Sequence, residues 1–168
     1  MGFLDHVHIA NNARLEQFAP LTHQGTRYGW VRRDRLDLLK DWPEAFQVLA
    51  HHVEIVDHDG DIEARNAALA DAARGLADCG EITGWRGELY PVATRFNSPP
   101  VALIERAMAS FLGIRAWGGH MNGYVRKADG LHMWIARRAF DKPTYPGLLD
   151  NMVAGGQPHG INCLDNMV

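Results

Sequence analysis

The sequence feature that most constrains the fold is a long amphipathic segment, Asp61 to Ala77, which lies between groups of short apolar runs. Asp61 is suited to accept hydrogen bonds from the first turn of a helix, as N-cap residues do. The positions expected to face a core recur at helical spacing: Ile62, Leu69, Ala73 and Leu76. One such helix among several short strands predicts an α+β fold.

The apolar runs on either side of this helix are short enough to be strands of an antiparallel or mixed sheet. The runs before it are residues 29–31, 46–49 and 53–56, with a helical turn at residues 36–39 and a short helix within residues 3–18. After it, residues 85–95 are expected to be loop and strand.

A second helix is expected to start at Ser98-Pro99-Pro100, because serine caps helices and proline is tolerated in the first turn. Its apolar face would comprise Val101, Ile104, Met108, Phe111 and Leu112. Gly113 can end it.

The last third of the chain is expected to contain strands at residues 120–126 and 131–137, joined by a hairpin turn at Asp129-Gly130. Residues 141–160 are rich in Gly and Pro and predict mostly loop around one short strand at 152–154. We place a domain boundary between Ile114 and Gly119, which gives an accessory α+β domain at 1–116 and a second unit at 117–168.

Composition narrows the class of function. The chain is 46% hydrophobic and 22% charged, with a net charge of -3 and a pI near 6.3, so no general attraction for a nucleic acid polymer or anionic membrane is expected. Cys79 and Cys163 form no CxxC pair, and no apolar run is long enough to span a bilayer. These observations favour a cytoplasmic protein with a small-molecule partner.

Four stretches occur in an order that resembles the opening of a Nudix hydrolase domain, in the branch related to the Nudix part of fungal thiamine pyrophosphokinase-linked proteins. They are His120–Val125, Met133–Arg138, Lys142–Asn151 and Val153–Gly160. The resemblance implies an accessory domain followed by the first strands of a Nudix α/β/α sandwich. It also implies hydrolysis of an organic diphosphate, such as damaged thiamine diphosphate or an oxidised nucleoside diphosphate, with Mg²⁺ or Mn²⁺ as cofactor.

The family's sequence box begins with Gly, five residues and Glu, and the register set by Gly156 puts Asn162 in the Glu slot. Gly155, Gly160 and Asn162 complete the start of the box, and the backbone of Gly156 is the one metal contact suggested. The Arg and paired Glu slots fall beyond Val168, so the catalytic carboxylates are not assigned to this sequence. We therefore expect a truncated product that is inactive alone. Asn162 should cap a helix that has Asp165 in its first turn.

Four residues are candidates for substrate binding. Arg137 and Arg138 end a strand and suit bidentate phosphate contacts, although a solvated strand end is the commoner role. Asn122 lies on a strand that could face a ligand, or it makes a structural hydrogen bond. Trp85, between two glycines and beside Arg86, is the tryptophan best placed to stack on a substrate ring, although core aromatics are commoner.

Other chemistries have little support. There is no HExxH, no GxSxG elbow and no phosphate-binding P-loop, and Asp57, Asp59 and Asp61 suggest a turn and cap more than a calcium loop. Besides the hydrolase, two hypotheses stay open: a non-catalytic fragment for ligand binding or subunit contact, and an unrelated α+β binding domain. A truncated Nudix sheet would expose apolar surface, so we expect aggregation or a homo-oligomer.

Overall fold

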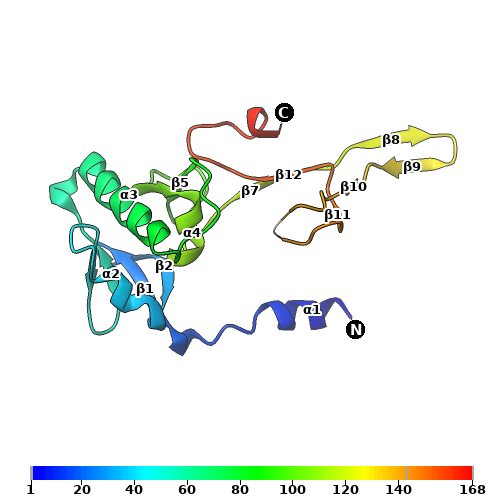
Figure 1. Ribbon diagram of the computed structural model, residues 1–168. Coiled ribbons are helices and arrows are strands. Elements are labelled where there is room, and N and C mark those ends of the chain that lie inside the picture. The colour runs from blue at the N-terminus through cyan, green and yellow to red at the C-terminus, as the bar shows by residue number, and fades with distance from the viewer. Residues whose placement is uncertain (1, 143, 168) are drawn as a thin grey trace.

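The computed structural model describes residues 2–142 and 144–167, and these divide into regions of different character (Figure 1). We call residues 15–117 the body, residues 118–156 the arm, and residues 157–167 the returning segment. The arm extends away from the body and comes back to it along its last strand, and the returning segment begins at the body and then turns back over the arm (Figure 1). Helix α1 (Phe3–Ala10) stands apart and buries none of its residues. The expected N-terminal helix is therefore confirmed for its first half.

The body contains a four-stranded mixed sheet with the order β2-β1-β4-β3. Its strands are β1 (Phe18–His23), β2 (Thr26–Arg32), β3 (Phe46–Val48) and β4 (Val53–Ile55). β1 pairs antiparallel with β2 and parallel with β4. The short helices η1 (Leu15–Gln17), η2 (Arg33–Arg35) and α2 (Leu36–Leu39) flank these strands. The runs predicted as strands are confirmed, and β1 is an additional strand.

Helix α3 (Ile62–Asp78) follows the 3-10 turn η3 (His58–Gly60) and packs one face into the core of the body. Asp61 Oδ1 accepts hydrogen bonds from the backbone N–H of Glu63 at 2.9 Å and of Ala64 at 3.2 Å, which confirms the predicted cap. Leu69, Ala73 and Leu76 are buried as expected. Ile62 is 38% exposed, so its assignment to the core was wrong. It is the first residue of α3, in the first turn of the helix.

A strand occupies the place where the second helix was expected to begin, and this prediction was wrong. β5 (Leu89–Val92) and β6 (Ala102–Glu105) form an antiparallel pair in which Tyr90 lies opposite Ile104. Helix α4 (Arg106–Leu112) starts only afterwards, capped by the Glu105 side chain. Gly113 ends α4 with φ 59°, as predicted. Pairing with β5 satisfies the backbone of residues 102–105 and so overrides their helical spacing.

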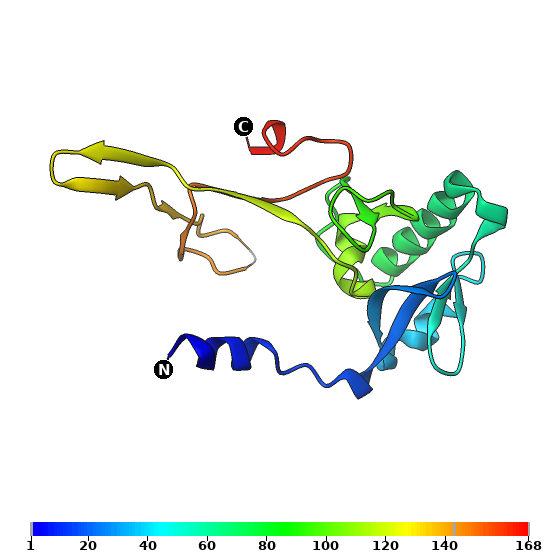
Figure 2. The same cartoon turned by 180° about the vertical axis from the view of Figure 1, so that it is seen from behind.

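The arm consists of three two-stranded ladders: the β8–β9 ladder continues the line of β7–β12, and the β10–β11 ladder branches off to one side where these two meet (Figure 2). Its strands are β7 (Gly118–Met121), β8 (Tyr124–Lys127), β9 (Gly130–Met133), β10 (Ala136–Arg137), β11 (Leu149–Asp150) and β12 (Val153–Gly156). β7 pairs with β12, β8 with β9, and β10 with β11, all antiparallel. The hairpin turn before Gly130 is confirmed, but each of the two expected strands is divided into two.

In the part of the chain that the structure describes, the hydrophobic core lies in the body. The buried apolar side chains run from Ala19 to Ile114 and include Leu21, Val53 and Leu69 at 0% exposure. Together the sheet, the β5–β6 pair and the helices confirm the predicted α+β class. Across residues 2–142 and 144–167, no helix is long and apolar enough to cross a membrane.

Candidate functional site

The site lies where the returning segment meets the body. Glu105, at the end of β6, holds the neighbouring parts of the body together. Glu105 is 5% exposed, and its carboxylate accepts hydrogen bonds from the backbone N–H of Arg86 at 2.8 Å and of Gly87 at 3.1 Å. It also accepts from the N–H of Ala107 at 3.3 Å. These three donors compensate a buried negative charge. One side chain therefore joins the loop before β5, strand β6 and helix α4.

Tyr90 and Arg106 form a platform beside Glu105. The Arg106 guanidinium pairs with Glu88 at 2.8 Å and lies 5.6 Å from the centroid of the Tyr90 ring. Burial raises the pKa of the Tyr90 phenol, and the nearby Arg106 charge partly opposes that shift. The phenol is therefore neutral at physiological pH.

Gly156, the last residue of β12, packs directly on this platform. A Cβ atom at this position would lie 1.7 Å from Tyr90 Oη and 3.2 Å from Arg106 Cζ, so the contact requires glycine. Its carbonyl oxygen accepts a hydrogen bond from Asn166 Nδ2 at 2.9 Å. Nothing lies within 4 Å of the position that a Cβ atom on the neighbouring Gly155 would take. The two glycines of the pair thus differ in their surroundings.

The returning segment is fastened to the body by backbone hydrogen bonds. The N–H of Gln157 donates to the carbonyl of Trp117 at 2.9 Å, and the N–H of His159 donates to the carbonyl of Leu89 at 2.7 Å. Gln157 is itself 6% exposed. These bonds connect the end of β12 to two separate edges of the body.

Asn162 follows as a helix cap. Its Oδ1 atom accepts hydrogen bonds from the backbone N–H groups of Leu164 and Asp165, both at 3.0 Å. The turn that it begins is the 3-10 helix η4 (Asp165–Met167). The local structure expected for Asn162 is confirmed.

A cavity of about 490 Å³, which we call the junction cavity, opens between the returning segment and the β5–β6 loop. The lining residues with aromatic, cationic or amide side chains are Arg95, Phe96, Asn97, Trp117, Gln157, His159 and Asn162. The rings of Phe96 and Trp117 lie 6.0 Å apart at an interplanar angle of 55°. Gly160 and Ile161 form part of the same wall. The stretch that resembles the Nudix box thus lines a cavity shared with the body.

Both candidate arginines hold a loop of the arm. Arg138 donates to the carbonyls of Thr144 at 2.8 Å and Tyr145 at 3.1 Å, and pairs with Asp150 at 2.6 Å. Arg137 donates to the carbonyl of Gly147 at 2.9 Å. The hydrogen bond from Arg138 holds the pKa of the Asp150 carboxyl below its usual range. A phosphate would have to compete with these contacts.

Asn122 and Trp85 lie in different places. Asn122 Oδ1 accepts a hydrogen bond from Asn151 Nδ2 at 2.5 Å within the arm. Trp85 lies in the body, 46% exposed, and lines a separate cavity of about 380 Å³ beside α3. The structure therefore does not gather the four candidates into one site.

No group of three or more His, Cys, Asp or Glu side chains within residues 2–142 and 144–167 could hold a metal ion. Asp57, at the start of the Asp-rich turn, instead pairs with Arg65 at 2.7 Å. The suggested metal contact, the carbonyl of Gly156, already accepts the Asn166 hydrogen bond. The described residues do not fit a metal centre.

Sequence reasoning missed most of the residues that line the junction cavity. Arg95 and Phe96 stand just before Asn97-Ser98-Pro99-Pro100, a run of turn-forming residues that would have signalled an exposed loop tip. The same run also suits the start of a helix, which the sequence predicts there and the structure does not have. Nothing in the local pattern links this loop to His159.

A family model described as "Domain of unknown function (DUF4743)" matches residues 2–116 of the chain. It thus covers α1 and the body as far as Ala116, and none of the arm.

Three curated relatives extend the similarity into the arm. Two Arabidopsis thaliana proteins named Nudix hydrolase 20, chloroplastic, and Nudix hydrolase 24, chloroplastic, are each 36% identical over 99% of this chain, which covers 48% and 47% of their lengths. An uncharacterized Saccharomyces cerevisiae protein is 35% identical over 83% of the chain and 44% of its own length. The chain spans about half the length of the curated relatives it matches.

Proposed function

Since this chain belongs to the DUF4743 family and is related to Nudix hydrolases, we propose that it supplies an accessory domain and the first strands of a Nudix-type diphosphate hydrolase. In this proposal residues 1–116 are the accessory domain and residues 117–168 open the Nudix domain. The substrate is an organic diphosphate, either damaged thiamine diphosphate or an oxidised nucleoside diphosphate.

The main observation in support of this proposal is that residues 156–162, which we call the box-like segment, are attached to the body. Gly156 packs on Tyr90, and the His159 N–H donates to Leu89, so residues 156–162 are held on a folded scaffold. Hydrolysis of a diphosphate depends on fixed positions of the groups around the phosphates. The accessory domain would then serve to position the start of the box.

The proposed cofactor is Mg²⁺ or Mn²⁺, which would neutralise phosphate charge and acidify a water. The described residues do not fit a metal centre, and in this proposal the box slots that hold the metal carboxylates are not assigned to residues 1–168. Residues 1–168 alone are therefore expected to be inactive.

A second candidate function is non-catalytic ligand binding or subunit contact. Two observations favour it: Asn162 stands where the box has Glu, and the arm exposes large apolar side chains such as Trp134 at 60% and Phe140 at 80%. In water such surface favours association, so this alternative predicts a homo-oligomer. We place either form in the cytosol, where the exposed Cys79 and Cys163 would stay reduced.

The test is turnover by the protein expressed from its native reading frame. We expect release of phosphate or monophosphate from oxidised thiamine diphosphate or 8-oxo-deoxyguanosine diphosphate in the presence of Mg²⁺ or Mn²⁺, and none after chelation. The 168-residue chain, assayed in parallel, should give no turnover. Absence of turnover in the native protein with every substrate and metal would refute the hydrolase proposal, and light scattering would then test for a homo-oligomer.

A further inference from the structure

We propose that the junction cavity binds a heteroaromatic ring that carries a phosphate group, with the ring against Phe96 and Trp117 and the phosphate near Arg95 and His159. The cavity lies between the β5–β6 loop and the returning segment, and its volume of about 490 Å³ suits a small molecule. The assignment deepens the proposed function, on which it rests for the link between this ligand and a reaction.

The aromatic wall is open to a ligand. Phe96 is 47% exposed, although its ring lies only 6.0 Å from that of Trp117. The two rings are tilted by 55° and lie too close for a third ring between them, so a planar ligand ring would stack on the exposed surface of Phe96 with Trp117 beside it. Such a corner accepts a planar ring, and four prolines complete the apolar lining.

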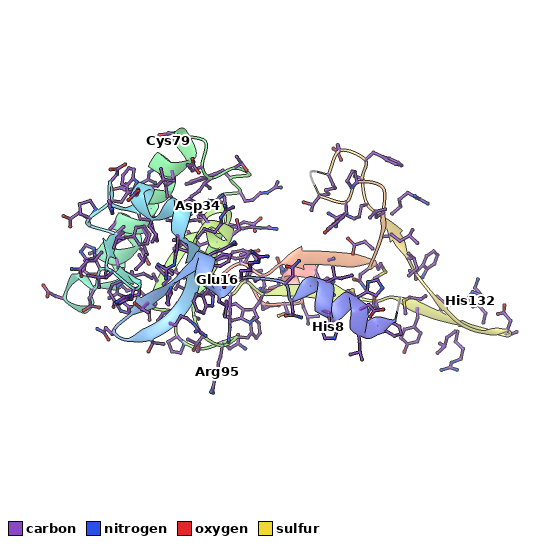
Figure 3. The ribbon with its side chains drawn as sticks, turned by 90° about the horizontal axis from the view of Figure 1, so that it is seen from below. His8, Glu16, Asp34, Cys79, Arg95 and His132 are labelled. Carbon is purple, nitrogen blue, oxygen red and sulfur yellow. The ribbon has the colours of Figure 1, made fainter. Side chains whose placement is uncertain are left out.

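The charge of the lining favours an anion. Among the described residues, the side chains of Arg95 and His159 have no hydrogen-bond or salt-bridge partner, and no acidic residue lines the cavity. Arg95 extends outward from the body at the cavity rim (Figure 3). A guanidinium in this position can contact phosphate without first breaking another ion pair.

The loop that presents Arg95 and Phe96 is ordered before a ligand arrives. Both the backbone N–H and the hydroxyl of Ser98 donate to the Arg95 carbonyl, at 3.3 Å and 2.9 Å. Asn97 has φ 60°, in the left-handed region. Arg115 also donates to the carbonyl of Thr94. A preformed site loses less entropy on binding.

The cavity beside Trp85 is a weaker candidate for the same ligand. Its cation, Arg74, is paired with Asp71 at 2.5 Å, and the negative charge of Glu105 lies on its wall. A phosphate there would meet an occupied guanidinium and a carboxylate. The junction cavity has neither obstacle.

Calorimetric titration of the 168-residue chain tests the proposal with three matched probes: adenosine 5′-monophosphate, adenosine and ribose 5-phosphate. The monophosphate should bind at least about tenfold more tightly than either partial probe. Phe96→Ala should weaken binding of both adenine-containing probes about tenfold, the usual size of an aromatic stacking loss. Arg95→Ala should weaken the monophosphate and leave adenosine unchanged.

Two variants in the arm serve as controls. Phe140→Ala removes a ring that is 80% exposed, against 47% for Phe96, and Arg126→Ala removes an exposed guanidinium on β8. Neither should change binding of any probe. If the wild-type chain does not bind the monophosphate, or if the arm variants lose as much as the cavity variants, the proposal is wrong.

These results are separable from the hydrolase test. Ring- and Arg95-dependent binding without turnover by the native protein would support the binding site and refute the hydrolase. Turnover that Phe96→Ala and Arg95→Ala leave unchanged, together with unchanged binding, would refute the binding site and support the hydrolase.

Discussion

The body and the arm are built from similar residues but are stabilised differently. The body buries its apolar side chains between a sheet, a β-hairpin and helices, and the buried hydrophobic residues within 2–142 and 144–167 all belong to it. The arm has comparable apolar residues, but Tyr124, Leu131 and Met133 on its hairpin are 67%, 61% and 58% exposed. His132, on β9, lies at the end of the molecule farthest from the body (Figure 3).

This difference shows that regular strands can form in this chain without a hydrophobic core around them. The ladders of the arm satisfy backbone hydrogen bonds, but an isolated two-stranded ladder is only marginally stable in water. Local patterns are enough to form the arm's strands, whereas burial stabilises the body. Gly156, at the end of the arm, and the start of the returning segment share in the packing of the body.

The largest contrast is expected for leucines in the two regions. Leu69→Ala, in α3 at 0% exposure, should lower the free energy of unfolding by about 2–5 kcal/mol, because it leaves a cavity. Leu131→Ala, in β9, should change it by less than about 0.5 kcal/mol. Urea unfolding followed by tryptophan fluorescence measures both. Equal losses would mean that the arm has a core of its own.

A second contrast concerns two arginines on the same helix. Arg65 is 5% exposed and donates to the Asp57 carboxylate and backbone, so Arg65→Ala should cost roughly 2–3 kcal/mol. Arg74 pairs with Asp71 in solvent, and Arg74→Ala should cost less than about 1 kcal/mol. Thermal unfolding of the two variants compares them. A loss for Arg74→Ala as large as that for Arg65→Ala would contradict this assignment.

The third contrast is within the glycine pair at the junction. Gly156→Ala should release the returning segment, at a cost of about 1–3 kcal/mol from overpacking against Tyr90. Gly155→Ala should be tolerated, because nothing lies within 4 Å of its Cβ position. Limited proteolysis should cleave residues 153–162 faster only in the first variant. Equal cleavage would show that Gly156 is not the anchor.

The smallest effect is electrostatic and confined to the arm. The hydrogen bond from Arg138 lowers the pKa of the Asp150 carboxyl below its ordinary value of 3.8. A lowered folded-state pKa means that this contact stabilises the loop at neutral pH and is lost as the pH falls through the folded value. An NMR titration of the carboxyl should show the pKa rising in Arg138→Gln. An unchanged pKa would refute the contact.

The sequence predicted the parts of the fold that depend on neighbouring residues. The cap at Asp61, the turn before Gly130 and the cap at Asn162 each involve groups a few residues apart, and all three are present. Strand β1 escaped prediction because Pro20 lies inside it, and a proline usually argues against a strand.

The site was less predictable because it depends on distant pairings. Ile104 and Met108 share a helical spacing, but Ile104 pairs with Tyr90 in a ladder that only the folded body provides. The bond from His159 to Leu89 likewise joins segments that no local pattern connects. For Arg137 and Arg138 the sequence suggested a ligand contact that the structure does not provide. Their guanidinium groups suit phosphate, but in the fold they bind Gly147 and Asp150 of the neighbouring loop.

Amide hydrogen exchange at the junction tests the central claim most directly, namely that the body holds the start of the box-like segment. The N–H groups of Gln157 and His159 should exchange about as slowly as those of β5, since they donate to the carbonyls of Trp117 and Leu89. The N–H groups of the β8–β9 hairpin should exchange much faster. Exchange of Gln157 and His159 at the hairpin's rate would contradict the account.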